Sequence, residues 1–172
     1  MTPSNRPPLV KNNGLVLPFS EIRGLCVDEA RRKIIGAGKK RLADITLYDL
    51  IIPDNHGIYF FFAPDGATCL YVGKNSSLQF VERMGSHFAV DQTSWHNHFL
   101  KYYKAQHKVA SLIETAQAVA DCRLLLMPVT SELISSAEKF FRVALSPVLN
   151  RRKARNPVCD DAKLEDAVEN IA

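Results

Sequence analysis

This chain of 172 residues has no closely spaced cysteines. Its four cysteines, Cys26, Cys69, Cys122 and Cys159, are far apart in the sequence, and no two of them form a Cys-x-x-Cys pair. This spacing argues against a zinc site and a disulfide framework, so we expect buried or inert thiols. No apolar stretch approaches the roughly 20 residues that span a bilayer. The segment Met1 to Pro8 is polar and rich in proline, unlike a secretory signal. We therefore expect a cytoplasmic protein with no membrane partner.

Internal repeats and obvious DNA-reading modules, such as a zinc finger or a helix-turn-helix, are also absent. The chain is 47% apolar and 23% charged, which is ordinary for a globular protein. The net charge of +4 is uneven, because several basic runs contrast with an acidic end after Asp160: Arg31-Arg32-Lys33, Lys39-Lys40-Arg41 and Arg151-Arg152-Lys153. Such runs permit a polyanionic partner, although taken alone they are more often solvated helix ends.

Two apolar, β-prone runs predict a β-hairpin. Gly57 to Ala63 and Thr68 to Gly73 are joined by the turn tripeptide Pro64-Asp65-Gly66. The hairpin places one tyrosine, Tyr59, near the start of its first strand and another, Tyr71, near the end of its second. A third strand is predicted over Arg123 to Val129. Because proline has no backbone N–H to donate, Pro128 requires either that this strand lies at a sheet edge or that Pro128 stands at the strand's end.

Helices are predicted on both sides of the hairpin. Two helices are predicted before it: Phe19 to Ile35, capped by Ser20, and Arg41 to Ile51. Four helices are predicted after it: from Ser76 or Ser77 to Phe88, from Ser94 through Tyr103, from Val109 to Val119, and from a Thr130 or Ser131 cap to Leu145. A weaker helical stretch covers Ala162 to Ile171. The order from the hairpin onward is β-β-α-α-α-β-α, which predicts an α/β fold around a small sheet.

Four polar residues in these elements are candidates for chemistry. Arg83 and His87 are four residues apart, so they share one face of their predicted helix. Glu138 is placed beside the core-facing stripe of the last helix, and Asn150 follows the helix end at Pro147. Each of these residues alone would be read as a surface or turn residue.

Taken in order, Gly57-Ile58-Tyr59, Tyr71-Val72-Gly73, Arg83, His87, Glu138 and Asn150 resemble the motifs of the GIY-YIG nucleases. Two departures are visible: Val72 stands in place of isoleucine, and Arg83 lies twelve residues after Tyr71, about two more than in the simplest members. The resemblance implies an α/β fold of GIY-YIG type, with a small, mainly antiparallel three-stranded sheet flanked by helices. The resemblance covers roughly Gly57 to Asn150. It implies a nuclease core over residues 53–150, after an N-terminal arm and helical extension (1–52) and before a basic then acidic tail (151–172).

The resemblance also implies roles in phosphodiester hydrolysis. Glu138 would bind one divalent ion, Mg²⁺ or Mn²⁺, because a lone carboxylate leaves room for water and substrate oxygens. Arg83 would hold the phosphate, and Tyr59 would be the general base or a relay to one. Lys74 or His87 would supply positive charge to Tyr59, although Lys74 could equally contact DNA. Tyr71 would position the phosphate or the water, and Asn150 would orient its neighbours.

The implied partner is DNA, contacted by basic residues around the site: Lys74, Lys101, Lys104, Arg151 and Arg152. The stretch from Trp95 to Tyr103 reads either as a core face with a basic rim or as a nucleic-acid contact helix, and phosphate contact by His96 and His98 is a further alternative. Because a single site cuts one strand at a time, a homodimer is plausible. A non-catalytic nucleic-acid-binding domain and a ribonuclease remain as alternatives. Convergence of Tyr59, Tyr71, Arg83 and Glu138 on one basic groove would favour the nuclease, whereas a Glu138 side chain that points away into solvent would rule it out.

Overall fold

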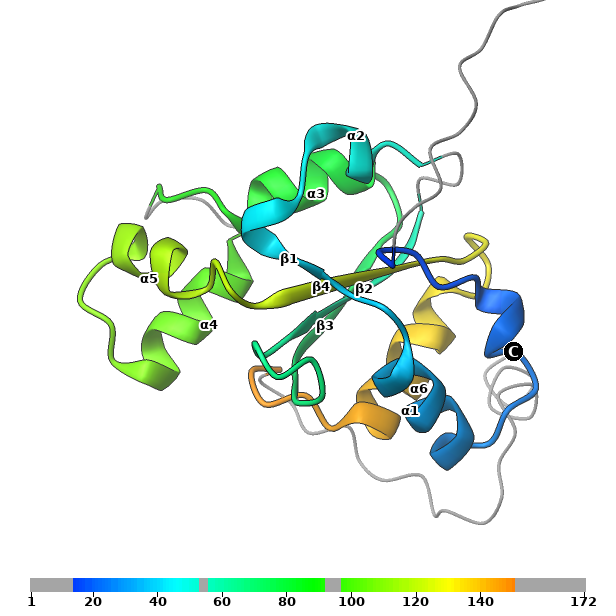
Figure 1. Cartoon of the computed structure of the whole chain (residues 1–172). Helices are drawn as coiled ribbons and strands as arrows, with labels where there is room; N and C mark the ends of the chain where they lie inside the picture. Colours follow the sequence, from blue (N-terminus) through cyan, green and yellow to red (C-terminus); the bar gives the residue numbers. More distant parts are fainter. Residues whose placement is uncertain (1–13, 53–55, 92–96, 151–172) are drawn as a thin grey trace, which may run out of the picture.

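The computed structural model describes residues 14–52, 56–91 and 97–150 and has an α/β architecture (Figure 1). Four strands form one sheet in the order β1-β4-β2-β3, and every neighbouring pair is antiparallel. The strands are β1 (Lys40–Arg41), β2 (Gly57–Phe62), β3 (Cys69–Asn75) and β4 (Arg123–Pro128). The predicted α/β class and the mainly antiparallel sheet are confirmed, whereas the predicted number of three strands is too small.

The predicted hairpin is formed by β2 and β3. Tyr59 lies opposite Gly73 and Phe61 lies opposite Tyr71, and a register shift follows between Phe61 and Phe62. Strand β4 is central, since it lies between β1 and β2. Pro128 is its last residue, where a missing amide hydrogen costs the least pairing.

The unpredicted strand β1 pairs with the outer edge of β4, through Lys40 opposite Leu124 and Arg41 opposite Arg123. Residues 15–17 follow the same edge, where Leu126 N donates to Leu15 O at 2.8 Å and Leu17 N donates to Leu126 O at 2.9 Å. Two polar residues carry no hydrophobic alternation, so sequence periodicity does not reveal such a strand. The part of the N-terminal segment that the structure describes thus completes the sheet.

The helix predicted over Phe19 to Ile35 is wrong as one continuous element. A short 3₁₀ turn, η1 (Phe19–Glu21), is followed by Gly24 at φ 81°, and α1 (Val27–Gly36) begins only after this left-handed residue. The start of α1 is fixed by Glu29, whose carboxylate accepts from the backbone N–H of Cys26 at 3.1 Å. The sequence did not reveal this break because the apolar residues on its two sides keep helical spacing.

The helix predicted over Arg41 to Ile51 is also wrong: β1 is followed by η2 (Leu42–Asp44) and the short α2 (Leu47–Leu50). The remaining predicted helices are present with shifted starts. They are α3 (Phe80–His87), capped at Gln79 rather than at Ser76 or Ser77; α4 (His98–His107); α5 (Leu112–Ala118); and α6 (Ile134–Leu145), which begins after Leu133 rather than at Thr130 or Ser131. Ser94 and the stretch Ala162 to Ile171 lie outside the described residues.

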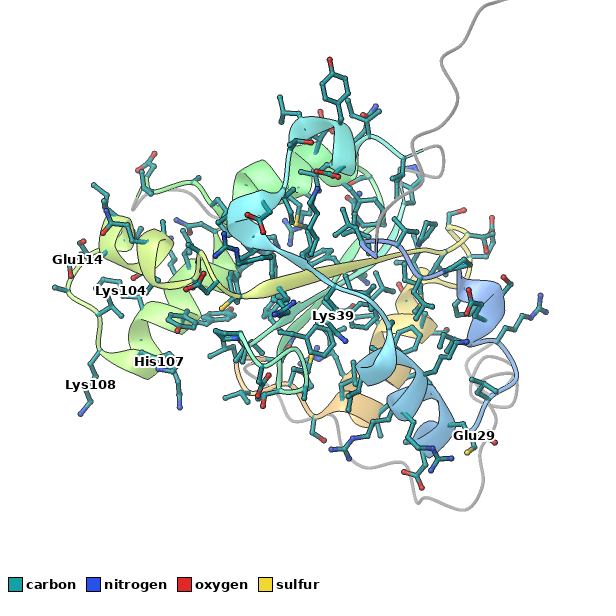
Figure 2. The ribbon with its side chains drawn as sticks, viewed as in Figure 1. Glu29, Lys39, Lys104, His107, Lys108 and Glu114 are labelled. Carbon is teal, nitrogen blue, oxygen red and sulfur yellow. The ribbon has the colours of Figure 1, made fainter. Side chains whose placement is uncertain are left out.

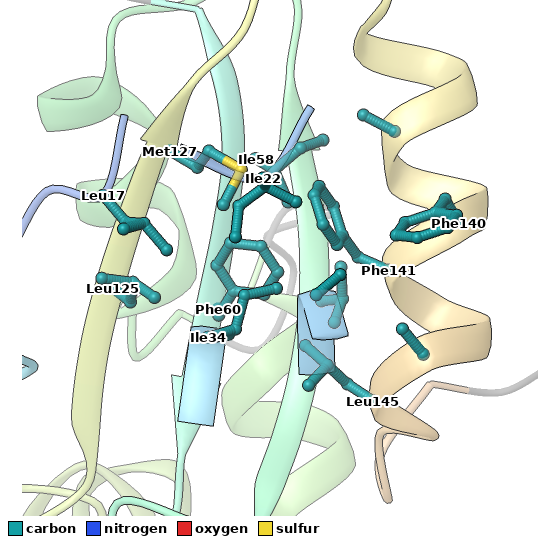
Figure 3. Packing of buried hydrophobic residues seen from close by; sticks show 14 of the residues in the cluster. Leu17, Ile22, Ile34, Ile58, Phe60, Leu125, Met127, Phe140, Phe141 and Leu145 are labelled. Atoms are coloured by element: carbon teal, nitrogen blue, oxygen red, sulfur yellow. The ribbon is translucent and has the colours of Figure 1, made fainter. Parts of the chain in front are cut away.

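The sheet is buried on both faces, with α1 and α6 on one side and α2, α3, α4 and α5 on the other (Figure 1). Figure 3 shows the first layer, where Phe141 and Phe140 of α6 pack toward Phe60 and Ile58 of β2. Because successive strand residues alternate between faces, Tyr59 and Phe61 belong to the second layer. The functional candidates on α3 and on α6 therefore approach the sheet from opposite faces.

Two smaller expectations concern thiols and membranes. Cys69 and Cys122 are free and buried, and burial raises the pKa of Cys69 to about 12, so this thiol is inert as predicted. Within the three described stretches, no helix combines the length and the hydropathy that a bilayer crossing needs.

Candidate active site

The side chain of Tyr59 lies at the centre of the candidate site. Its ring crosses from β2 over the facing residue of β3, Gly73, whose lack of a side chain gives the ring its space. Tyr59 is fully buried, and its ring stacks beside that of Tyr71 with centroids 6.2 Å apart. The two tyrosines of the sequence motif therefore meet on the same face of the hairpin.

The Tyr59 hydroxyl lies between two side chains of α3. Arg83 Nε donates to Tyr59 Oη at 3.0 Å, and His87 Nε2 lies 2.6 Å from the same oxygen. Arg83 and His87 meet one atom because they lie one helical turn apart on α3. The helix start places this face, since Glu82 accepts from the backbone N–H of Gln79 at 2.8 Å. Three of the predicted site residues are thus in direct contact.

The imidazole of His87 is contacted at both of its nitrogens. The backbone N–H of Phe99 donates to His87 Nδ1 at 3.4 Å, and His87 Nε2 faces Tyr59 Oη. The hydrogen bond between Tyr59 and His87 runs in one direction or the other according to the tautomer of His87. Arg83, which donates from Nε, is a charged group in direct contact with the Tyr59 hydroxyl.

Burial is the main influence on the acidity of Tyr59. It raises the pKa of the phenol well above its ordinary value of 10, and Tyr71 and Glu138 act in the same direction. Arg83 opposes this shift through its charge and its hydrogen bond. The phenol is therefore protonated at neutral pH, and the charged donor Arg83 is in position to stabilise the phenolate when it forms.

Tyr71 is buried among groups from three helices. Its ring lies 5.7 Å from that of His87 on α3 and 6.3 Å from that of Tyr102 on α4. Burial raises the pKa of Tyr71, while the charges of Arg83 and Arg142 lower it and that of Glu138 raises it. Both arginines and the carboxylate of Glu138 are therefore within electrostatic range of the Tyr71 hydroxyl.

Glu138 points toward the edge of the sheet. Its side chain is 20% exposed, and Lys74 of β3 lies with Nζ 3.6 Å from Glu138 Oε2. The ammonium of Lys74 also donates to Ser135 Oγ at 3.0 Å, so α6 holds it from two positions one turn apart. Because Lys74 follows Gly73 in β3, this ion pair lies on the opposite face of the edge strand from Tyr59 and Tyr71.

Asn150 is bound to the outer edge of β3. Its Oδ1 accepts from Val72 N and its Nδ2 donates to Val72 O, both at 2.9 Å. Residues just before it run along the same edge, with Leu149 N donating to Leu70 O at 2.8 Å. The amide satisfies the backbone of the residue between Tyr71 and Gly73, so Asn150 positions the strand that carries the site.

Arg142 and Ser135 were missed by sequence reasoning. Arg142 lies one turn beyond Glu138 on α6, is half-buried and acts on Tyr71. The spacing of four residues was available as a signal, but no strand-edge partner was visible for either residue. Lys101 and Lys104 line a separate hollow beside α4, whereas Arg151, Arg152, Trp95 and His96 lie outside the described residues.

The donors at Glu138 suit a weakly held divalent ion. Glu138 offers one partly exposed carboxylate at the edge of β3, on the opposite face of that strand from Tyr59 and Tyr71. Among the described residues, no cluster of three His, Cys, Asp or Glu side chains forms a ready-made metal cage. A single carboxylate is enough for Mg²⁺, which keeps several waters and takes substrate oxygens. A hollow of about 650 Å³ along α1 belongs to the other side of the molecule and contains none of these residues.

No protein-family model, curated protein or solved structure matches this chain.

Proposed function

We propose that this chain is a metal-dependent endonuclease that hydrolyses phosphodiester bonds in DNA, of the GIY-YIG type that its motifs resemble. The observation that carries the proposal is the hydroxyl of Tyr59, held between Arg83 Nε at 3.0 Å and His87 Nε2 at 2.6 Å. Glu138 acts electrostatically on the same tyrosine from the other layer. Base, cation and carboxylate are the groups that phosphodiester hydrolysis requires.

Tyr59 is the proposed general base or relay. Since burial raises its pKa, the reactive phenolate is a minor species at neutral pH that Arg83 and added positive charge stabilise. Tyr71, whose ring stacks beside that of Tyr59, would hold the water or a phosphate oxygen through its hydroxyl.

Arg83 is the proposed phosphate-binding residue. Its bond to Tyr59 uses Nε, and the two terminal nitrogens of the guanidinium suit a bidentate phosphate contact. Lys74 is a second cation at the edge of β3, and Lys101 and Lys104 on α4 are proposed DNA contacts farther out. Asn150 keeps the edge strand in register with these groups.

Glu138 would hold one Mg²⁺ or Mn²⁺ ion. When bound, such an ion supplies positive charge beside the nonbridging and leaving oxygens of the phosphate. The ion pair with Lys74 has to open for this, because the ammonium lies against one carboxylate oxygen. We also propose that the protein works in the cytoplasm and acts as a homodimer for double-strand cuts, since one site serves one strand.

Two other functions fit the same fold. A non-catalytic nucleic-acid-binding domain would not need a fully buried Tyr59 hydroxyl in contact with both Arg83 and His87, which favours the enzyme. A ribonuclease would use the same groups, so RNA belongs among the substrates tested.

The test is incubation of supercoiled plasmid, and separately of RNA, with the purified protein in Mg²⁺ and in EDTA. We expect nicked or linear plasmid with Mg²⁺ and none with EDTA. Glu138→Gln should abolish cutting, whereas Glu114→Gln, which removes an exposed carboxylate on α5, should not. Binding without cleavage of either nucleic acid would favour the binding domain, and cleavage of RNA alone would identify a ribonuclease.

A further inference from the structure

Helix α4 carries two stacks of a histidine on a tyrosine. The rings of His98 and Tyr102 have centroids 5.6 Å apart and planes inclined by 27°. The rings of Tyr103 and His107 lie 4.2 Å apart at 28°. Both pairs span one helical turn and have the same chemistry, so their surroundings alone distinguish them.

The first stack adjoins the candidate active site. Tyr102 lies 6.3 Å from Tyr71, which in turn lies 6.2 Å from Tyr59. Four rings therefore lead in series from the buried hydroxyl of Tyr59 to the partly exposed side chain of His98. In the second stack, Tyr103 packs on Phe99, and Figure 2 shows His107 with Lys104 and Lys108 at the far end of α4.

Positive charge runs along α4 beside both stacks, so the contact with Tyr71 is what sets the first stack apart. Residues His98 to His107 include Lys101 and Lys104 and no acidic residue. Lys101 is next to Tyr102 in the helix, and both lysines line a hollow of about 280 Å³ with Ala105 and Leu112. Aromatic rings beside cations are the combination with which proteins hold a nucleic-acid strand, through stacked bases and contacted phosphates.

We propose that the His98–Tyr102 stack is a platform for the base of the nucleotide next to the scissile phosphate, with Lys101 contacting the backbone of that nucleotide. This inference rests on the proposed nuclease function. Its support is the continuity of the rings with Tyr71 and Tyr59, together with the positive charge of α4.

The platform defines a class of substrate. A base inside a duplex is stacked on both faces, so it reaches a protein ring only after it is unpaired or turned out of the helix. The preferred substrate is therefore a nucleic acid with a single-stranded or locally opened nucleotide at the cut. Supercoiled plasmid, which opens locally under torsional stress, is consistent with this class.

Binding measurements in the Glu138→Gln background separate this proposal from cleavage. The probes are a short fluorescein-labelled DNA single strand and the same sequence as a duplex. Tyr102→Leu keeps an apolar side chain against Tyr71 but removes the ring. We expect it to weaken single-strand binding by about tenfold or more and to change duplex binding little. Tyr103→Leu, the matched control, should change neither.

Fluorescence gives a second readout. Tyr102→Trp should retain single-strand binding, and its emission should be quenched when a base stacks on it, whereas Tyr103→Trp should show no added quenching. Equal losses for Tyr102→Leu on single strand and duplex, or equal effects of the Tyr102 and Tyr103 changes, would overturn the platform. If the wild type does not cut plasmid but Tyr102→Leu still weakens single-strand binding selectively, the nuclease function is refuted and the base platform is retained.

Discussion

The Tyr59 side chain lies so close to Gly73 that a Cβ atom at residue 73 would fall 2.3 Å from both the Cζ and the hydroxyl oxygen of Tyr59. The two residues face each other across β2 and β3. The glycine of the second sequence motif therefore positions the tyrosine of the first, since only a residue without a side chain admits the ring.

Gly73→Ala should consequently displace the Tyr59 hydroxyl from Arg83 and His87. We expect cleavage to fall by about 10²-fold or more, because small misplacements of reacting groups have effects of this size. Single-turnover rates measure the loss, and thermal unfolding measures the accompanying destabilisation. Gly85→Ala is the control, because a Cβ there meets nothing within 4 Å. Equal rates for both variants would contradict the positioning role.

The glycine contact illustrates what sequence could and could not reveal. The hairpin was predictable because its two apolar runs and its turn carry local signals, and the α3 face was predictable from the spacing of Arg83 and His87. The contacts of Ser135 and Asn150 with β3 were not, because they join residues separated by 61 and 78 positions and depend on how α6 crosses the sheet. The break at Gly24 was missed because apolar spacing continued through a single left-handed residue.

The activity should rise with pH. Burial raises the pKa of Tyr59 above its ordinary value, so the base form grows throughout the neutral and mildly alkaline range. We expect single-turnover rates to increase by about tenfold per pH unit between roughly pH 7 and 9, as for one required deprotonation. A flat profile would exclude the Tyr59 phenolate as the base. If Tyr59→Phe keeps measurable activity with the same slope, another group sets the pH dependence.

Removal of the Lys74 ammonium should strengthen metal binding. Its Nζ lies 3.6 Å from Glu138 Oε2 and would repel a divalent ion on that carboxylate. Lys74→Met should bind Mn²⁺ about tenfold more tightly than the wild type, as titration of free Mn²⁺ by electron paramagnetic resonance would show. Lys139→Met removes an exposed charge from α6, the helix that carries Glu138, and should leave the Mn²⁺ affinity unchanged. Unchanged or weaker binding by Lys74→Met would show that the ion does not compete with Lys74.

Arg142 should contribute to cleavage although no motif includes it. Its charge acts on Tyr71 from one turn beyond Glu138, where it would also attract a phosphate. Arg142→Gln should lower kcat/KM by about 10²-fold. Arg142→Lys should recover part of the loss, because a charge remains without the planar fork. Lys139→Gln is the matched control on α6, and an equal effect from that exposed lysine would reduce the role of Arg142 to general attraction.

Asn150 should act on stability and activity together. Its amide closes both hydrogen bonds of the Val72 backbone at 2.9 Å, at the point where β3 carries Tyr71 and Gly73. Asn150→Ala leaves both backbone groups without this partner and should cost about 1–3 kcal/mol of unfolding free energy. Asn150→Asp keeps an acceptor for Val72 N but faces Val72 O with a second acceptor, so we expect a similar loss.

Urea unfolding and single-turnover cleavage, measured on the same Asn150 preparations, separate two roles. A structural role through β3 predicts that cleavage recovers under conditions that fully restore folding, with an unchanged pH profile. A direct role at the phosphate predicts a lower rate even in fully folded protein. Because the amide is bound to the backbone of Val72 on both of its atoms, the structure favours the first outcome. Gln117→Ala, an exposed amide on α5, controls for the loss of a side-chain amide as such.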